Sequence, residues 1–222
     1  MKIHREFLQY SDAWWAIRRG MPTASEFDRI ITPANGDFSK SATGYACQLI
    51  ADMYSPSYGP SDDYVSAAMK NGTDTEPEAR RMYEFDRGVK VQEVGFCVSD
   101  CGRFGCSPDA LVGAGGVVEI KCPEPQTQVM YVIEGGLPQK YKPQVHGHLV
   151  VTGRSWCDFV SYSPNLPELI VRVVPDDYTK KLRDALDQFD ALMKKLIEQL
   201  GLGEPPPNPQ DEPYELPAML TQ

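Results

Sequence analysis

Apolar residues recur at helical spacing near the C-terminal end of the chain. Between residues 177 and 200 they fall three or four positions apart, and charged residues fill most positions between them. This spacing places the apolar side chains on one face of a helix, and such a face packs against the rest of a protein. The pattern predicts a long amphipathic helix with these apolar positions: Leu182, Leu186, Phe189, Leu192, Leu196 and Leu200.

Two short helices are predicted near the N-terminus. Residues 11–19 begin with Ser11, which is a good N-cap. The next segment, from Thr23 to Glu26, reads TASE, which is a capping-box pattern. It predicts a helix with Thr23 as N-cap that ends at about residue 31. Ser25 would lie in its first turn, where free backbone N–H groups favour phosphate.

Three further helices are predicted along the chain. Residues 41–53 carry apolar positions at helical spacing, and residues 140–151 do so with Gln144 near their start. Residues 73–87 have an acidic start and a glycine after their end. Pro77 fits the first turn of that helix best, because proline lacks the backbone N–H group that later turns require.

Segments rich in Val and Phe alternate with turn residues through the second half of the chain. Residues 89–98, 102–112 and 117–120 are predicted as three strands of one sheet, and residues 155–163 and 168–174 as two further strands. Strands interspersed with helices predict an α/β fold in which helices flank a central sheet.

Length and composition predict one domain over residues 1–202, because a chain of 222 residues can bury one good-sized core. After Gly201 the composition changes to proline and acidic residues, so residues 203–222 are predicted to form an extended or disordered tail. This tail either keeps the protein soluble or serves as a docking strand for another subunit or partner.

A cytoplasmic location is predicted. No apolar run approaches the roughly 18 residues of a membrane span, and residues 1–6 lack the apolar core of a secretory signal. The six cysteines are then reduced thiols. The spacing of Cys97, Cys101 and Cys106 differs from that of known zinc sites, so packing within strands is the favoured interpretation.

Candidate chemistry gathers where two of the predicted strands are joined by the glycine-rich residues 113–116. A hairpin there would bring Asp109 close to Glu119, although ten positions separate them. Glu119 and Lys121 share one face of the second strand. Hydrolysis of a phosphodiester needs oxygen ligands for Mg²⁺, activated water and positive charge beside the phosphate oxygens. Asp, Glu and Lys supply all three.

The spacing P-D-x9-E-x-K from Pro108 to Lys121 resembles the signature of PD-(D/E)xK nucleases. Six motifs, two of which contain this signature, stand in the order found in the lambda-exonuclease-like viral recombination nucleases, also called the YqaJ type. The matching segments are WAIRRG (residues 15–20), TASE (23–26), GTDTEPEAR (72–80), CSPDAL (106–111), EIKCP (119–123) and YKPQ (141–144). The resemblance covers most of residues 11–152 and implies a restriction-endonuclease-like core with a central mixed sheet.

The resemblance also implies roles at the metal. Asp109, Glu119 and the backbone carbonyl of Ile120 would bind Mg²⁺, with Mn²⁺ able to substitute. Lys121 would orient or deprotonate the attacking water, and its role as base or as electrostatic stabiliser stays open. Glu76 resembles the helix-borne carboxylate that holds a second metal or a metal-bound water, so one or two metals are compatible with the sequence.

Neighbouring helices are implied to complete the catalytic residues. Gln144 matches the glutamine that contacts this site, whereas His146 and His148 are interpreted as ordinary polar residues, because Mg²⁺ prefers oxygen. The family also allows the helix that carries Glu76 to begin earlier, with a kink or break near Gly72.

Arg18, Ser25 and Ser107 match the positions that form a 5′-phosphate pocket in this family. Arg19 beside Arg18 leaves a one-residue ambiguity, and either arginine can be a solvated surface charge. Trp14 and Trp15 can stack on bases, although a core position is favoured for at least one of them.

The leading hypothesis is a Mg²⁺-dependent 5′-to-3′ exonuclease that degrades one strand of linear double-stranded DNA to leave 3′ overhangs. The resemblance implies a ring-shaped homotrimer, 5′-phosphorylated DNA ends as substrate, a single-strand annealing protein as partner, and a phage or prophage origin in a bacterial cytoplasm. A site-selective endonuclease and a catalytically inactive DNA-end-binding protein are the alternatives. The net charge of -9 argues against nucleic-acid binding unless metal ions or enclosure by an oligomer compensate.

Overall fold

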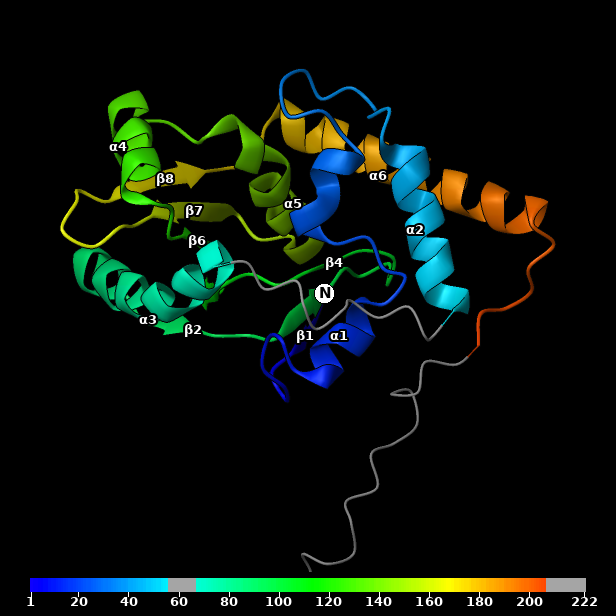
Figure 1. Cartoon of the computed structure of the whole chain (residues 1–222), viewed down its shortest axis with the longest axis horizontal. Helices are drawn as coiled ribbons and strands as arrows, with labels where there is room; N and C mark the ends of the chain where they lie inside the picture. Colours follow the sequence, from blue (N-terminus) through cyan, green and yellow to red (C-terminus); the bar gives the residue numbers. More distant parts are fainter. Residues whose placement is uncertain (56–66, 207–222) are drawn as a thin grey trace, which may run out of the picture.

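The computed structural model describes residues 1–55 and 67–206, with their side chains except those of residues 67–74. Two sheets organise this part of the chain (Figure 1). The larger has the strand order β2-β5-β6-β7-β8, and the smaller has the order β1-β3-β4. The strands are β1 (Lys2–His4), β2 (Val91–Gln92), β3 (Phe96–Val98), β4 (Gly105–Cys106), β5 (Ala110–Val112), β6 (Gly116–Lys121), β7 (Trp156–Ser161) and β8 (Leu169–Val173).

The larger sheet is mixed, as predicted. The strands β6 and β7 run parallel, whereas the other neighbours in this sheet are antiparallel. A parallel pair needs a long crossover connection, which here contains α4, η2 and α5. The helices are α1 (Asp12–Arg18), η1 (Ala24–Arg29), α2 (Ala42–Tyr54), α3 (Ala67–Arg87), α4 (Pro125–Glu134), η2 (Gln139–Tyr141), α5 (Lys142–Thr152) and α6 (Asp177–Gln199).

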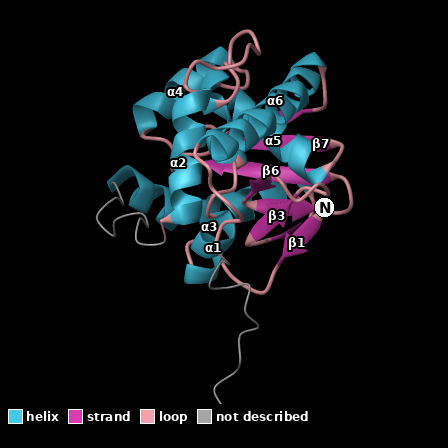
Figure 2. Ribbon diagram, turned by 90° about the vertical axis from the view of Figure 1, so that its right-hand side faces the viewer, coloured by secondary structure: helices cyan, strands magenta, loops and turns pink. Residues whose placement is uncertain are grey.

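Helices cover both faces of the larger sheet. On one face, Ala79 and Tyr83 of α3 pack against Val118 and Ile120 of β6. On the other face, α5 packs against the sheet, and η1, α2 and α6 form a further layer behind it. Figure 2 shows α5 and α6 together on one side of β6. Because side chains alternate along a strand, Glu119 and Lys121 point to the α5 side.

The predictions of one continuous strand over residues 89–98 and another over residues 102–112 are wrong, because each segment is divided between the two sheets. The first contributes β2 to the larger sheet and β3 to the smaller one, and the second contributes β4 and β5 in the same way. Pro108 lies between β4 and β5 and has no N–H group to donate to a ladder. Gly95 lies between β2 and β3, where the Phe7 carbonyl leaves no room for a Cβ atom.

The first predicted helix is confirmed as α1, and the Ser11 hydroxyl accepts a hydrogen bond from the Trp14 amide as an N-cap does. The second is a 3₁₀ helix, η1, and its predicted capping box is wrong. Thr23 is the N-cap residue but its side chain makes no capping hydrogen bond. The Thr23 hydroxyl lies instead within hydrogen-bonding distance of Arg18 and Ser25.

The prediction that Pro77 lies in a first turn is wrong, because α3 begins ten residues earlier at Ala67 and contains Pro77 in its interior. The earlier start that the family resemblance allowed is confirmed. The other predicted helices and the strands β7 and β8 are confirmed within a few residues. The sequence patterns did not predict β1, which has three residues, or α4, which buries Gln128 and Tyr131.

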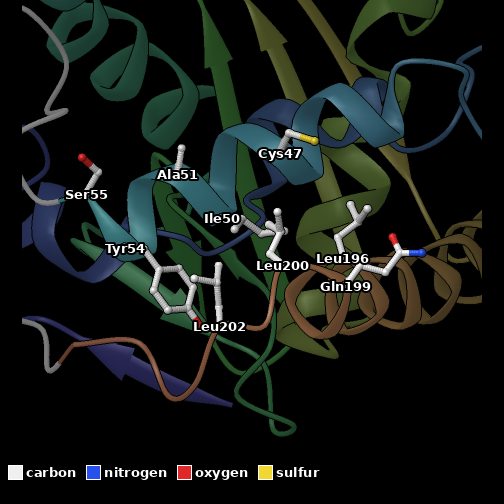
Figure 3. Close-up of a pocket in the computed structure, with 9 residues that line it drawn as sticks. All are labelled: Cys47, Ile50, Ala51, Tyr54, Ser55, Leu196, Gln199, Leu200 and Leu202. Atoms are coloured by element: carbon white, nitrogen blue, oxygen red, sulfur yellow. The ribbon is translucent and has the colours of Figure 1, made fainter.

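An apolar hollow of about 400 Å³ lies between α2 and the C-terminal end of α6 (Figure 3). Ile50 and Tyr54 of α2 face Leu196, Leu200 and Leu202 across it. The predicted tail follows directly, and from residue 207 onward it lies outside the described residues. Within residues 1–55 and 67–206, no helix has both the length and the apolar character that a membrane crossing requires.

An ion pair between buried Asp158 and exposed Arg172 joins β7 to the edge strand β8 and gives a test of the fold. Asp158 of β7 is fully buried and accepts two hydrogen bonds of 2.8 Å from Arg172 of β8, and a third of 2.7 Å from the Tyr83 hydroxyl. Removing Arg172 leaves the buried Asp158 carboxylate without its cation, and solvent at the exposed guanidinium reduces the loss.

We expect Arg172→Met to lower the free energy of unfolding by about 1–2 kcal/mol, because the Asp158 carboxylate stays buried with one neutral donor, whereas solvent already screens the exposed arginine. Urea denaturation at neutral pH measures the loss. The matched control is Lys180→Met, whose pair with Asp177 is exposed and contributes little to stability. Equal stability of the two variants would contradict the proposed importance of the Asp158–Arg172 pair.

Candidate active site

The β5–β6 hairpin brings Asp109 to β6. Ala110 pairs with Val118, and the Asp109 amide donates to the Val118 carbonyl at 3.1 Å. The Asp109 carboxylate in turn accepts a hydrogen bond from the Ile120 amide. The hairpin predicted from the glycine-rich turn is therefore confirmed, and Asp109 lies beside the strand that carries Glu119.

Glu119 is 1% exposed, and its two carboxylate oxygens both have close partners. Lys121 Nζ and Gln144 Nε2 each lie 2.6 Å from Oε1, and His148 Nε2 lies 2.6 Å from Oε2. Gln144 and His148 are four residues apart in α5, so both face β6 from the same side of the helix. The strand and the helix thus hold one buried carboxylate between them.

Electrostatic interactions shift the pKa values of these groups in opposite directions. Burial raises the pKa of Asp109 well above its usual range, and the nearby charges of Glu119 and Glu76 raise it further. Burial acts in the same sense on Glu119, but Lys121 and His148 outweigh it and lower the pKa of Glu119 to about 2. The crowding of like charges is what a site for a divalent cation would relieve.

Glu76 reaches this region from α3. It forms an ion pair with Arg80, which also contacts Glu93 at 2.8 Å. Glu76, Asp109 and Tyr10 line one pocket of about 260 Å³. Burial raises the pKa of Glu76 despite the opposing charge of Arg80. The predicted helix-borne carboxylate therefore faces the same space as the carboxylate of the hairpin.

The donor groups of this site suit Mg²⁺. Asp109 and Glu119 offer hard carboxylate oxygens, and Mg²⁺ commonly binds through one or two carboxylates while it keeps several waters. In the part of the chain that the structure describes, no three side chains of His, Cys, Asp or Glu come close enough to form a ready-made metal cluster. A ligand shell here would therefore be completed by water and substrate oxygens. The thiols of the six cysteines are free.

A second cluster surrounds the Ser107 hydroxyl. The Trp14 indole N–H donates to it at 2.7 Å, and an Arg18 guanidinium nitrogen lies 3.4 Å from it. Arg18 also donates to the hydroxyls of Thr23 at 3.1 Å and Ser25 at 3.3 Å. The three predicted phosphate-pocket residues thus lie together. One guanidinium and three hydroxyls form a positively charged, donor-rich site.

The structure distinguishes the two neighbouring arginines. Arg19 donates to the carbonyls of Asp52 and Met53 at the C-terminal end of α2. Arg18 instead stacks on the Trp14 ring, with its guanidinium carbon 4.1 Å from the ring centroid. Trp14 is buried, which confirms a core position for one of the two tryptophans. Arg18 is therefore the arginine that faces the hydroxyl cluster.

Two residues that surround these clusters were not predicted as site residues. His148 was interpreted as an ordinary polar residue, although its position four residues after Gln144 was a signal that both share a helix face. Trp14 had no such signal, because its contact with Ser107 joins segments that are 93 positions apart. The interpretation of His146 as an ordinary residue agrees with its hydrogen bond to Thr179 in α6 at 2.8 Å.

Solved structures share this fold. The alkaline exonuclease of Laribacter hongkongensis is 32% identical over 86% of this chain and 98% of its own, with a TM-score of 0.69. Its complex with dAMP matches over the same shares of both chains at a TM-score of 0.70. A phage-related exonuclease from Haemophilus somnus 129PT shares the fold at 11% identity and a TM-score of 0.62, over 81% and 96% of the two chains.

A search of curated proteins finds no match. The model of the YqaJ-like viral recombinase domain matches residues 13–155, which include the hairpin, both clusters and α5. This range exceeds half of the chain, and the relative at 32% identity is matched over nearly its whole length. The chain therefore belongs to the family of YqaJ-like viral recombinase domains.

Proposed function

We propose that the chain is a Mg²⁺-dependent exonuclease that degrades one strand of linear double-stranded DNA from its 5′ end and leaves a 3′ overhang. The observation that carries the proposal is the short distance between two sites. Ser107 belongs to the Arg18 cluster and Asp109 to the carboxylate cluster, and two residues of chain span at most about 7 Å. A strand whose 5′-phosphate lies beside Arg18 therefore presents its next phosphate to Asp109.

Asp109, Glu119 and the Ile120 carbonyl are the proposed Mg²⁺ ligands, with Glu76 acting through water and Mn²⁺ able to substitute. When bound, the ion supplies Lewis acidity toward the phosphate oxygens and activates water. Gln144 orients Glu119 through its hydrogen bond to Oε1. This assignment needs no thiol or imidazole ligand, in agreement with the preference of Mg²⁺ for oxygen.

The proposed reaction removes one nucleotide at a time. The oxygen of a water molecule bonds to phosphorus, the bond between phosphorus and O3′ of the terminal nucleotide breaks, and O3′ takes up a proton. Lys121 orients the water or stabilises the negative charge on the phosphate oxygens. The shortened strand ends in a new 5′-phosphate, which is the group that Arg18 is proposed to bind.

The proposed partners follow from the family and from the charge of the chain. A recombination role implies a single-strand annealing protein that receives the 3′ overhang. A net charge of -9 gives little general attraction for DNA. A ring-shaped homotrimer would keep the duplex enclosed and so compensate for weak contacts. A phage or prophage origin and action in a bacterial cytoplasm complete the proposal.

The first test is digestion of a linear duplex, with 5′-phosphates and one 5′-labelled strand, beside a covalently closed circle and an EDTA control. We expect Mg²⁺-dependent release of the label as mononucleotide, with the circle intact. Lys121→Ala is expected to lower the cleavage rate at least about 100-fold while end binding and folding persist. The remote Lys180→Ala is the matched control.

Cutting of the circle would replace this proposal with a site-selective endonuclease. Binding of ends without cleavage would replace it with an inactive end-binding protein. Full activity of the Lys121 variant would show that the assigned catalytic residues are wrong.

The phosphate pocket predicts a preference for phosphorylated ends. We expect Arg18→Ala to lower kcat/KM on 5′-phosphorylated duplex by about 100-fold and to leave the slow cleavage of 5′-hydroxyl ends unchanged, because a charge-assisted pair is lost. Arg19→Ala, which removes the neighbouring guanidinium, should keep the preference. If the Arg18 variant still prefers 5′-phosphorylated ends, the phosphate pocket lies elsewhere.

His148 is predicted to position Glu119. His148→Leu removes the hydrogen bond to Oε2, so we expect the affinity for Mn²⁺, measured by electron paramagnetic resonance, to fall about tenfold. His148→Gln can donate from a similar place and should recover most of the affinity. The control is His146→Leu, whose ring contacts Thr179 in α6. Equal Mn²⁺ affinity in all variants would mean that His148 serves packing alone.

A further inference from the structure

A strained turn precedes α1. The Ser11 amide and hydroxyl both donate to the Leu8 carbonyl, which closes a turn with Gln9 and Tyr10 at its centre. Tyr10 has φ of 66°. This left-handed conformation suits glycine, and it costs a bulky residue about 1 kcal/mol or more. A large aromatic residue thus stands where the backbone favours glycine.

The core does not account for this strain, because Tyr10 is 58% exposed. The turn is nevertheless held firmly. The Gln9 side-chain nitrogen Nε2 donates to the backbone carbonyls of Val94 at 3.3 Å and Pro108 at 3.0 Å, which ties the turn to the segment between Ser107 and Asp109. Strained and well-anchored residues concentrate at functional sites.

The Tyr10 ring lies between the two clusters of the active site. On one side its centroid is 5.1 Å from that of Trp14, the residue that donates to Ser107. On the other side Tyr10 lines the pocket that contains Glu76 and Asp109. The ring therefore borders both the place proposed for the 5′-phosphate and the place proposed for the next phosphate.

We infer that Tyr10 binds the terminal nucleotide of the degraded strand by stacking on its base. The inference rests on the proposed function. The nucleotide that is about to be released has its 5′-phosphate beside Arg18 and its 3′-phosphate beside Asp109, so its nucleoside spans the gap that Tyr10 borders. Every base has a flat π-face, so an aromatic ring holds any terminal base without reading sequence. Leu8, 77% exposed on the same turn, adds apolar surface there.

The test uses Tyr10→Gly, which removes the ring and suits the left-handed backbone, so the variant should fold at least as stably as the wild type. On a 5′-phosphorylated duplex we expect kcat/KM to fall about tenfold, the effect of losing one base stack of about 1.4 kcal/mol. On a duplex whose 5′-terminal nucleotide is abasic, the variant and the wild type should cleave at equal rates. Tyr10→Phe should match the wild type on both substrates.

The matched control is Asn165→Gly, which relieves the same kind of backbone strain, φ of 64°, at another turn. This substitution should leave the cleavage rates on the normal and the abasic duplex unchanged. A second readout uses 2-aminopurine as the 5′-terminal base, with Ca²⁺ in place of Mg²⁺. Wild type and Tyr10→Phe should quench its fluorescence by stacking, and Tyr10→Gly should not.

Equal losses on normal and abasic ends, or unchanged quenching in Tyr10→Gly, would overturn the stacking role while the exonuclease activity of the wild type stands. If the wild type releases no nucleotide from 5′ ends, the proposed function and this inference both fall. Digestion by the wild type thus distinguishes failure of the proposed exonuclease function from failure of the stacking role of Tyr10.

Discussion

The burial of one charged carboxylate constrains the whole site. Removing the Glu119 side chain from water costs several kcal/mol unless donors replace the lost hydration. Lys121 on the same strand and Gln144 and His148 on α5 supply these donors. Because two of the three come from the helix, they set how α5 lies across β6. The intervening Val145 and the following Leu149 then face the apolar core. Packing and site geometry therefore depend on one another.

The acidic composition is compatible with DNA as substrate because the relevant charges act at short range. Exposed charges separated by more than about 10 Å are largely screened at physiological salt, whereas buried groups are not. Around Ser107 the relevant group is the partly buried Arg18 cation, held over the Trp14 ring. Around Asp109 the carboxylates repel one another, which favours a divalent ion that also binds phosphate. The Arg18 cluster thus offers positive charge directly, and the Asp109 cluster would offer it once a divalent ion is bound, whatever the net charge of the chain.

Patterns within one segment predicted more of this protein than interactions between distant segments did. The apolar stripe of α6 and the hairpin that brings Asp109 to Glu119 are local, so periodicity and turn residues were sufficient. The capping box failed because Arg18, from another helix, lies close to the Thr23 hydroxyl. The division into two sheets also escaped prediction, because it depends on the distant N-terminal segment: the Gly95 amide donates to the His4 carbonyl, and β3 pairs with β1. Motif order predicted residues that the fold brings together, yet their partners, such as Trp14, are apparent only in the folded chain.

The spacing of the two clusters also explains why single nucleotides would be released. On the proposed function, the strand would be anchored at its 5′-phosphate and cut at the phosphate that reaches Asp109. The chain between Ser107 and Asp109 has little freedom to lengthen, because Pro108 has a fixed φ angle and a hydrogen-bonded carbonyl. Each cut would create a new 5′-phosphate one nucleotide further along, which is again the group that the Arg18 cluster is proposed to bind. On the proposed function, the product of each cleavage is thus the correctly anchored substrate for the next. The length removed per cut, one nucleotide, is set by the short protein segment from Ser107 to Asp109.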